Sequence, residues 1–180
     1  AGTALVGMTV DAAAYADEML TQSSITGMSV EKLQAYSYAA DLVDVSLETM
    51  TGSMAKNIKS MSNASQGSAK FAEAYDKLGV SVTNADGTLR DSETVYWEAI
   101  DALKGVANET ERDALAMQLF GKSAQDLNPL IAQGSEGIAA LTEEAKRMGA
   151  VLSADAIEKL GQFDDSVQRL KQGSLAAKRV

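Results

Sequence analysis

The run of residues 108–130 restricts the fold more than any other stretch, because it places several helix-boundary signals around one apolar stripe. Asn108 can accept a hydrogen bond from the first turn of a helix, and Glu111 stands at the capping-box position three residues later. The apolar residues that follow at the spacing of one helical face are Leu115, Leu119 and Phe120. The run therefore predicts a capped helix that buries this stripe.

Three further boundary signals follow within a few residues. Gly121 stands where a left-handed glycine would end the helix. Ser123 is predicted to cap a second short turn, with Asp126 three residues later. Asn128-Pro129 predicts a third helix start, because proline is tolerated in the first helical turn. The run thus reads as helix, break, short helix and break, a packing unit without obvious chemistry.

The composition extends this pattern to the whole chain. Hydrophobic residues make up 46% of the sequence, few are aromatic, and there is one proline in 180 residues. Alanine, methionine and leucine are strong helix formers, so we expect an all-α protein, a compact bundle of short amphipathic helices. Repeated polar caps and glycine stops, such as Ser46, Ser135 and Gly149, mark the helix ends.

One small hairpin-like turn is expected near residues 80–90. Val80, Val82 and Leu89 alternate around a turn at 84–87 that contains Asp86-Gly87. Alternating apolar residues around Asp-Gly are typical of a β-hairpin, which would need helices to cover it.

The chain is expected to have three parts. Residues 1–27 form a poorly defined N-terminal helix or linker, in which the first ten residues favour helix weakly. Residues 28–152 form a helical core, and residues 153–180 form a C-terminal helix that continues into a longer parent chain. The absence of an initial methionine and of a recognisable leader also suggests a segment of something longer.

The composition disfavours several classes of function. The chain has no cysteine and no histidine, which removes thiol chemistry and the usual general base near neutral pH. Its net charge of −9 lacks the basic face that nucleic acids require. No apolar run approaches the roughly 20 residues needed to span a bilayer. We therefore predict a non-enzymatic protein with no catalytic residues, no metal ligands, no cofactor and no nucleic-acid recognition.

Two motifs could carry chemistry, and both have simpler explanations. The residues at EF-hand positions three, five, six and twelve are Asn84, Asp86, Gly87 and Glu93. Position one is Val82 and position nine is Arg90, so a first carboxylate is missing and a cation faces the site; a turn explains the loop better. Gly121-Lys122-Ser123 resembles the end of a phosphate loop but lacks its first glycine and the preceding strand, so a helix break is preferred.

The sequence also resembles a known family. The segment TERDALAMQLFGKSAQDLNPLI (residues 110–131) closely resembles a signature of tail tape-measure proteins from long-tailed bacteriophages and prophages. Three further segments follow in that family's order, at Met28–Met61, Ala74–Leu103 and Ile131–Ser153. The resemblance covers roughly three quarters of the chain, from Met28 to about Phe163. Its structural signature in this chain comprises nine residues: Asn108, Glu111, Leu115, Leu119, Phe120, Gly121, Ser123, Asn128 and Pro129.

This resemblance implies a structural role. Tape-measure proteins set the length of a phage tail while tube subunits polymerise around the extended, largely helical chain. The implied partners are the tail tube protein, tail assembly chaperones and tail-tip or baseplate proteins, with self-association also open. The implied location is the virion tail, and the host cytoplasm during assembly.

An alternative from another class is a helical adaptor without a phage role. It would bind a partner helix through alanine and methionine faces, such as the stripe of Met50, Met54 and Met61. Methionine suits adaptable binding surfaces, but it also fills cores.

Overall fold

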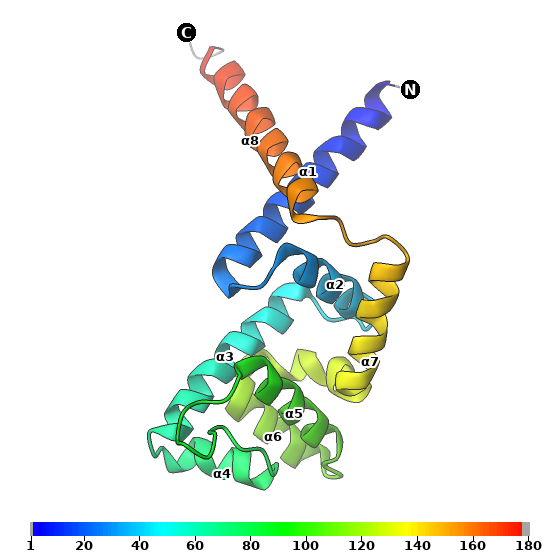
Figure 1. Cartoon of the computed structure of the whole chain (residues 1–180). Helices are drawn as coiled ribbons and strands as arrows, with labels where there is room; N and C mark the ends of the chain where they lie inside the picture. The colour runs from blue at the N-terminus through cyan, green and yellow to red at the C-terminus, as the bar shows by residue number, and fades with distance from the viewer. Residues whose placement is uncertain (1, 178–180) are drawn as a thin grey trace. The chain divides into compact units, whose positions relative to one another are not determined.

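The protein is all-α. The computed structural model describes residues 2–177, and it describes side chains for residues 11–163, 165–166 and 168–169. In chain order its helices are α1 (Gly2–Thr26), α2 (Val30–Asp41), α3 (Leu47–Ser65), α4 (Ala69–Lys77), α5 (Ser92–Lys104), α6 (Glu109–Phe120), the 3-10 helix η1 (Lys122–Leu127), α7 (Asn128–Arg147) and α8 (Ala154–Ala177) (Figure 1). They fall into two compact units: a central unit of residues 36–145 and a terminal unit of residues 1–35 and 146–180.

Short polar side chains start several of these helices, as the sequence pattern predicts. Ser46 accepts a hydrogen bond from Thr49 N at the start of α3, at 3.1 Å. Asp91 accepts one from Thr94 N at the start of α5, at 2.8 Å. Each bond satisfies a backbone donor that has no partner within the helix, which defines where the helix begins.

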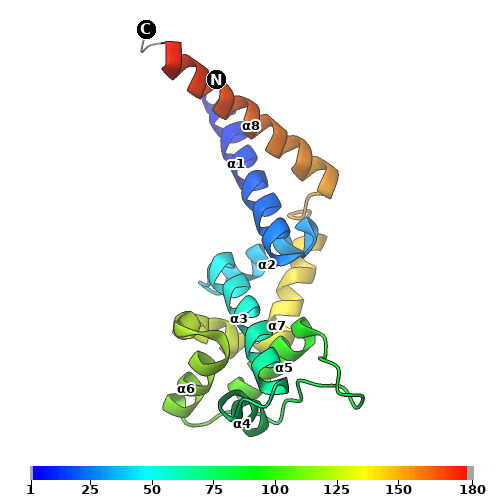
Figure 2. The same cartoon turned by 90° about the vertical axis from the view of Figure 1, so that its left-hand side faces the viewer.

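Helix α3 is the centre of the central unit. It packs against α4, α5, α6 and η1. Helices α4, α5 and α6 lie beside it in both views (Figures 1 and 2). Its apolar contribution to the core consists mainly of methionine: Met50 and Met61 are 0% and 1% exposed, and Met54 is also buried. Unbranched methionine side chains fill the irregular spaces between short helices that cross at different angles.

The buried face of α3 also carries a polar network. Asn57 is fully buried, donates to Ser92 O at 3.0 Å and accepts from the Tyr75 hydroxyl at 2.8 Å. The hydroxyl of Ser53, also on α3, is hydrogen-bonded to the hydroxyl of Tyr96 on α5 at 2.8 Å. Because buried polar groups are costly unless paired, these bonds specify how α4 and α5 dock on α3.

A second bond of this kind connects α3 to α6. Ser60 Oγ donates to Leu119 O at 2.7 Å. This carbonyl belongs to the last turn of α6, where helical carbonyls lack an intrahelical partner. The end of the predicted 108–120 helix is thereby attached to the centre of the unit.

In the terminal unit, α1 packs against α8. Gly161 of α8 is buried, and a methyl group placed on it would lie 2.6 Å from Cδ1 of Leu20. Ala13, Ala16 and Ile157 are fully buried in this unit. Small residues permit the two helices to approach closely at this point.

Gln34 connects distant parts of the terminal unit. Its amide pairs with the backbone of Leu152 in both directions, accepting from Leu152 N and donating to Leu152 O, each at 2.9 Å. The side chain is only 1% exposed. Nearby, Glu31 Oε1 accepts from Ala154 N at 2.8 Å and so caps the start of α8. Hydrogen bonds from its own backbone N–H and from that of Ala154 lower the pKa of Glu31.

We expect Gln34→Ala to release the segment before α8. The substitution removes both side-chain bonds to the backbone of Leu152, at an expected local cost of about 2 kcal/mol for the two hydrogen bonds. Hydrogen exchange at the Leu152 amide should accelerate correspondingly. Gln162→Ala, an exposed change on α8, should leave that amide unchanged; equal acceleration in both variants would contradict the role of Gln34.

The N-terminal segment is more helical than its composition predicts. The prediction placed a poorly defined helix or linker in residues 1–27, with weak helix over the first ten, whereas α1 runs from Gly2 to Thr26. Gly27 then adopts a φ of 73°, which ends the helix. Residues 1 and 178–180, which the predicted terminal parts include, lie outside the described residues.

The predicted hairpin near residues 80–90 is wrong as a pair of strands. Within residues 2–177, this segment forms a single antiparallel bridge between Thr83 and Leu89 and no strand. The reason is that its apolar pattern is not covered: Val80 is buried, but Leu89 is 45% exposed. An isolated two-stranded ribbon is marginal without such cover, so only the tight turn around Gly87 persists.

Candidate functional site

The first candidate is the signature run of residues 108–130, and its first half folds as predicted. Asn108 Oδ1 accepts from Glu111 N at 3.0 Å and caps α6. The apolar stripe of Leu115, Leu119 and Phe120 is buried, with the last two at 0% exposure. The Phe120 ring lies 5.1 Å from that of Tyr96 on α5.

The break after α6 differs in detail from the prediction. Gly121 has φ 90° and ψ −174°, a positive-φ conformation that glycine tolerates but outside the left-handed helical region that was predicted. The predicted cap at Ser123 is wrong: η1 begins at Lys122, Gly121 precedes it, and no side chain caps it. Ser123 is exposed within η1 because the glycine already redirects the chain.

The third predicted start is confirmed, since α7 begins at Asn128 with Pro129 in its first turn. Asn128 Oδ1 is buried and makes no hydrogen bond within the described part of the chain. A second break then interrupts α7 at Gly134, with φ 73° and ψ 179°. Asp101 of α5 caps the helix that resumes there, accepting from Ser135 N at 2.7 Å and from the Ser135 hydroxyl.

Two glycine substitutions should shift stability in opposite directions. Gly134→Ala would force a side chain into a positive-φ conformation and place its Cβ 2.9 Å from Asp101 Oδ1, so we expect a loss of about 2 kcal/mol. Gly52 lies inside α3 with open space around it, so Gly52→Ala should gain about 0.5–1 kcal/mol through helix propensity. Urea unfolding of both variants measures the two effects, and a stabilising Gly134→Ala would refute the assigned break.

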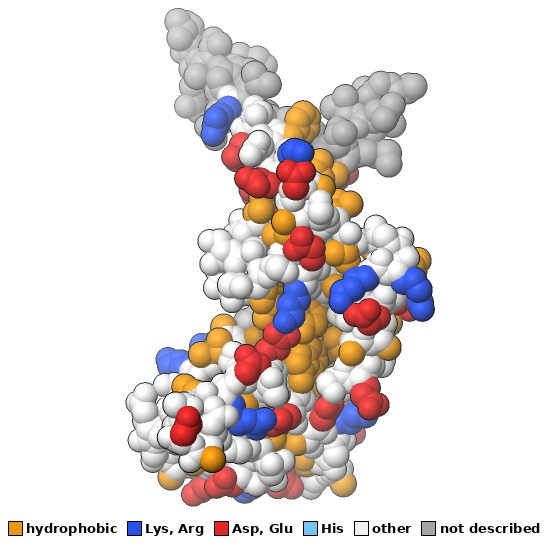
Figure 3. Space-filling model, viewed as in Figure 1, with side chains coloured by type: hydrophobic (Ala, Val, Ile, Leu, Met, Phe, Trp, Pro, Cys, Tyr) orange, Lys and Arg blue, Asp and Glu red, His pale blue; other side chains and the backbone are white. Residues whose placement is uncertain are grey.

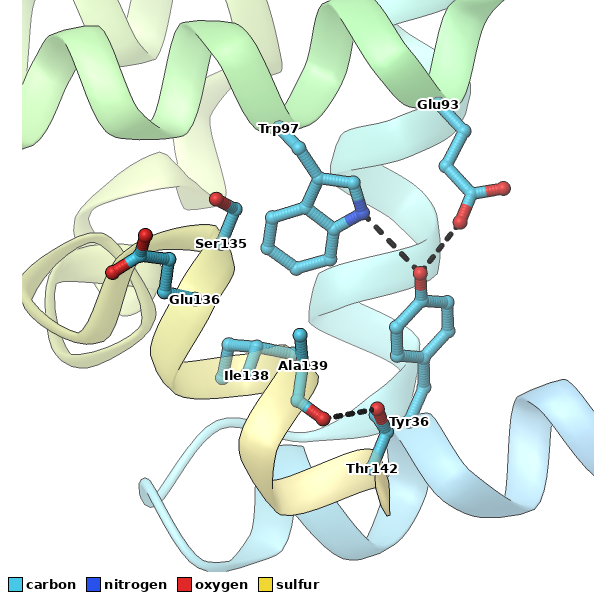
Figure 4. Close-up of a pocket in the computed structure, with 8 residues that line it drawn as sticks. All are labelled: Tyr36, Glu93, Trp97, Ser135, Glu136, Ile138, Ala139 and Thr142. Atoms are coloured by element: carbon cyan, nitrogen blue, oxygen red, sulfur yellow. Dashed lines mark hydrogen bonds between the residues drawn. The ribbon is translucent and has the colours of Figure 1, made fainter.

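The second candidate is an open pocket of about 370 Å³ in the central unit. It lies between α5 and α7, beside the aromatic ring of Tyr36 on α2 (Figure 4). Its lining residues are Tyr36, Glu93, Trp97, Ser135, Glu136, Ile138, Ala139 and Thr142. In the space-filling view, hydrophobic side chains gather in the middle of the visible face and are bordered by charged groups (Figure 3).

An aromatic pair and one carboxylate shape this pocket. Trp97 Nε1 donates to Tyr36 Oη at 3.2 Å, and the Tyr36 hydroxyl donates to Glu93 Oε1 at 2.5 Å. The two rings are 5.9 Å apart and tilted by 44°. Burial and the hydrogen bond to Glu93 both raise the pKa of Tyr36, so its phenol stays protonated and remains a donor at neutral pH.

Tyr96, next to Trp97 on α5, anchors that helix in the core. It is fully buried, and the centroids of the Tyr96 and Trp97 rings are 5.1 Å apart, with the rings at 78° to each other. Burial raises the pKa of Tyr96 as well. The indole is therefore held between a buried tyrosine and a hydrogen-bonded one, which fixes its orientation at the pocket.

In the loop that partly matches a calcium-binding pattern, Asp86 and Arg90 make hydrogen bonds and an ion pair within the protein. Asp86 Oδ1 accepts from the backbone N–H of Thr88 at 3.0 Å and from its hydroxyl at 2.6 Å. These bonds lower the pKa of Asp86. Arg90 forms a two-pronged ion pair with Glu98 on α5, at 2.8 and 2.6 Å. The loop is thus a turn fastened to α5, and within the described residues no three acidic, histidine or cysteine side chains gather as a metal-binding group.

The structure does not bring the signature run and the pocket together, since no residue of 108–130 lines the pocket. The sequence pattern did not predict this pocket. Its lining residues come from three helices that are far apart in the chain, so no local spacing of residues indicates that they meet.

Comparison with protein-family models, with curated proteins and with solved structures found no match to this chain. Among the described helices, none has the length and apolarity required to cross a bilayer. The described residues define an all-α protein whose central unit holds an open pocket lined in part by Tyr36 and Trp97.

Proposed function

We propose that this chain is a segment of a phage tail tape-measure protein, with a structural and non-catalytic role. The observation that carries the proposal is the structural role of the run of residues 108–130, which resembles the family. Asn108 caps a helix, Gly121 and Asn128-Pro129 set the breaks, and Phe120 fills the core. The residues that carry the family resemblance set where helices begin, break and pack. A protein that determines length depends on this geometry of the chain.

The mechanism we propose is geometric. A helix rises about 1.5 Å per residue, so 180 residues could span at most roughly 270 Å as one continuous helix. The central unit instead packs short helices around α3. The segment would therefore have to open in an assembled tail in order to measure its full length, and the partners would be the tail tube, assembly chaperones and tail-tip proteins.

Tail length tests this proposal. In the phage or prophage that encodes the chain, deleting residues 36–145 in frame from the parent gene should shorten the tails by up to about 1.5 Å per deleted residue. Electron microscopy measures the lengths. Inserting an unrelated helical segment of the same length should restore them. Tails that assemble with unchanged length after the deletion would refute the role.

The alternative is a helical adaptor without a phage role. The methionine stripe proposed for it (Met50, Met54 and Met61) lies on the buried face of α3 and offers no docking surface. The pocket beside Trp97 is the observation that favours a binding function. Tail-tube and tail-tip genes next to the coding sequence would support the phage role over the adaptor.

A further inference from the structure

The pocket between α5 and α7 offers acceptors and ring faces but few donors. The donors that line it are already engaged: Trp97 Nε1 bonds to Tyr36, Tyr36 bonds to Glu93, and Thr142 Oγ1 donates to Ala139 O at 2.8 Å. The Ser135 hydroxyl donates to Asp101 outside the pocket. A ligand that needs donors from the protein, such as an anion, finds none of these available.

The remaining surface suits a cation with an apolar stem. The indole of Trp97 is partly exposed, and Ala139 is exposed beside the buried Ile138. Two carboxylates, Glu93 and Glu136, belong to the lining, with Glu136 exposed at the rim. The nearby cation, Lys104, donates to Gln133 O and does not line the pocket. Aromatic faces next to carboxylates attract guanidinium groups through both stacking and charge.

We propose that this pocket binds an arginine side chain presented by a partner protein. The guanidinium lies over the Trp97 indole, its N–H groups meet the carboxylates, and its methylene stem contacts Ala139 and Ile138. The pocket is open rather than enclosed, which suits a side chain projecting from another protein surface, and the net charge of −9 favours a basic partner. This inference goes beyond the proposed function and does not depend on it.

The test uses the full chain and two peptides. One carries a single arginine in a neutral sequence, and the other carries citrulline, the uncharged isostere, at the same position. Because Trp97 is the only tryptophan, its indole N–H gives one resonance that reports directly on the pocket. The arginine peptide should shift it saturably, and the citrulline peptide should bind at least about fivefold more weakly.

Charge variants give the second arm. Glu136→Gln and Glu93→Gln should each weaken arginine-peptide binding by about two- to fivefold; glutamine at position 93 can still accept from Tyr36. Glu73→Gln, an exposed change on α4 away from the pocket, removes the same charge and should leave binding unchanged.

Several results would overturn the proposal. Equal binding of the citrulline peptide would mean that the pocket is merely apolar. An equal loss in Glu73→Gln would indicate attraction by overall charge alone. A shift of the Trp97 resonance on concentrating the chain by itself would place a second copy in the pocket instead of a basic partner.

Discussion

Phe120→Ala should lower the free energy of unfolding by about 3–5 kcal/mol. Phe120 is fully buried at the end of α6 and lies against the ring of Tyr96. Truncation removes the buried aromatic area and leaves a cavity that the surrounding helices can fill only in part. Urea unfolding followed by circular dichroism and by the fluorescence of Trp97 measures the loss.

The control for this prediction lies on the same helix. Met117 is 38% exposed, so Met117→Ala should lose well under half as much stability. If the two substitutions had similar effects, α6 would not pack by the predicted stripe, and the assignment of the signature run to core packing would fail.

The second large effect is expected at Asn57. Replacing it with leucine keeps most of the side-chain volume but removes the bonds to Ser92 O and to the Tyr75 hydroxyl. Tyr75 is only 1% exposed, so its hydroxyl would face a methyl group in place of the Asn57 amide. We expect a loss of about 3 kcal/mol, because a buried polar group without its partner bears its full desolvation cost.

A double-mutant cycle separates this polar effect from poor packing. Tyr75→Phe removes the hydroxyl, so Asn57→Leu combined with Tyr75→Phe should recover part of the stability that Asn57→Leu loses. Were the double variant as unstable as the sum of the single ones, the hydrogen bond would not be what holds α4 to α3.

Local signals in the sequence predicted the all-α class and several boundaries correctly. Asn108 caps its helix, and Asn128-Pro129 begins another. Such predictions succeed because a cap involves side-chain and backbone groups only three residues apart, so their energies are nearly independent of the rest of the fold. The same local reasoning placed a cap at Ser123, where the conformation of Gly121 had already redirected the chain.

Local signals failed where the outcome depends on burial. The alternating residues around Asp86-Gly87 are typical of a hairpin, yet the structure leaves Leu89 exposed and only one bridge forms. Conversely, α1 extends to Gly2 although its first residues favour helix weakly. A short apolar segment adopts the secondary structure in which neighbouring helices can bury its apolar side chains. A single sequence does not reveal which helices those are.

What the sequence determined by itself is the all-α class, several helix starts such as those at Asn108 and Asn128, and a composition that lacks histidine and cysteine chemistry. Only the tertiary structure decided which polar groups meet: Gln34 with Leu152, Asn57 with Tyr75, and Tyr36 with Trp97 and Glu93. These partners are far apart in the chain, and their pairing depends on how complete helices pack. The aromatic pocket exists for that reason, since it forms only where three separately capped helices come together.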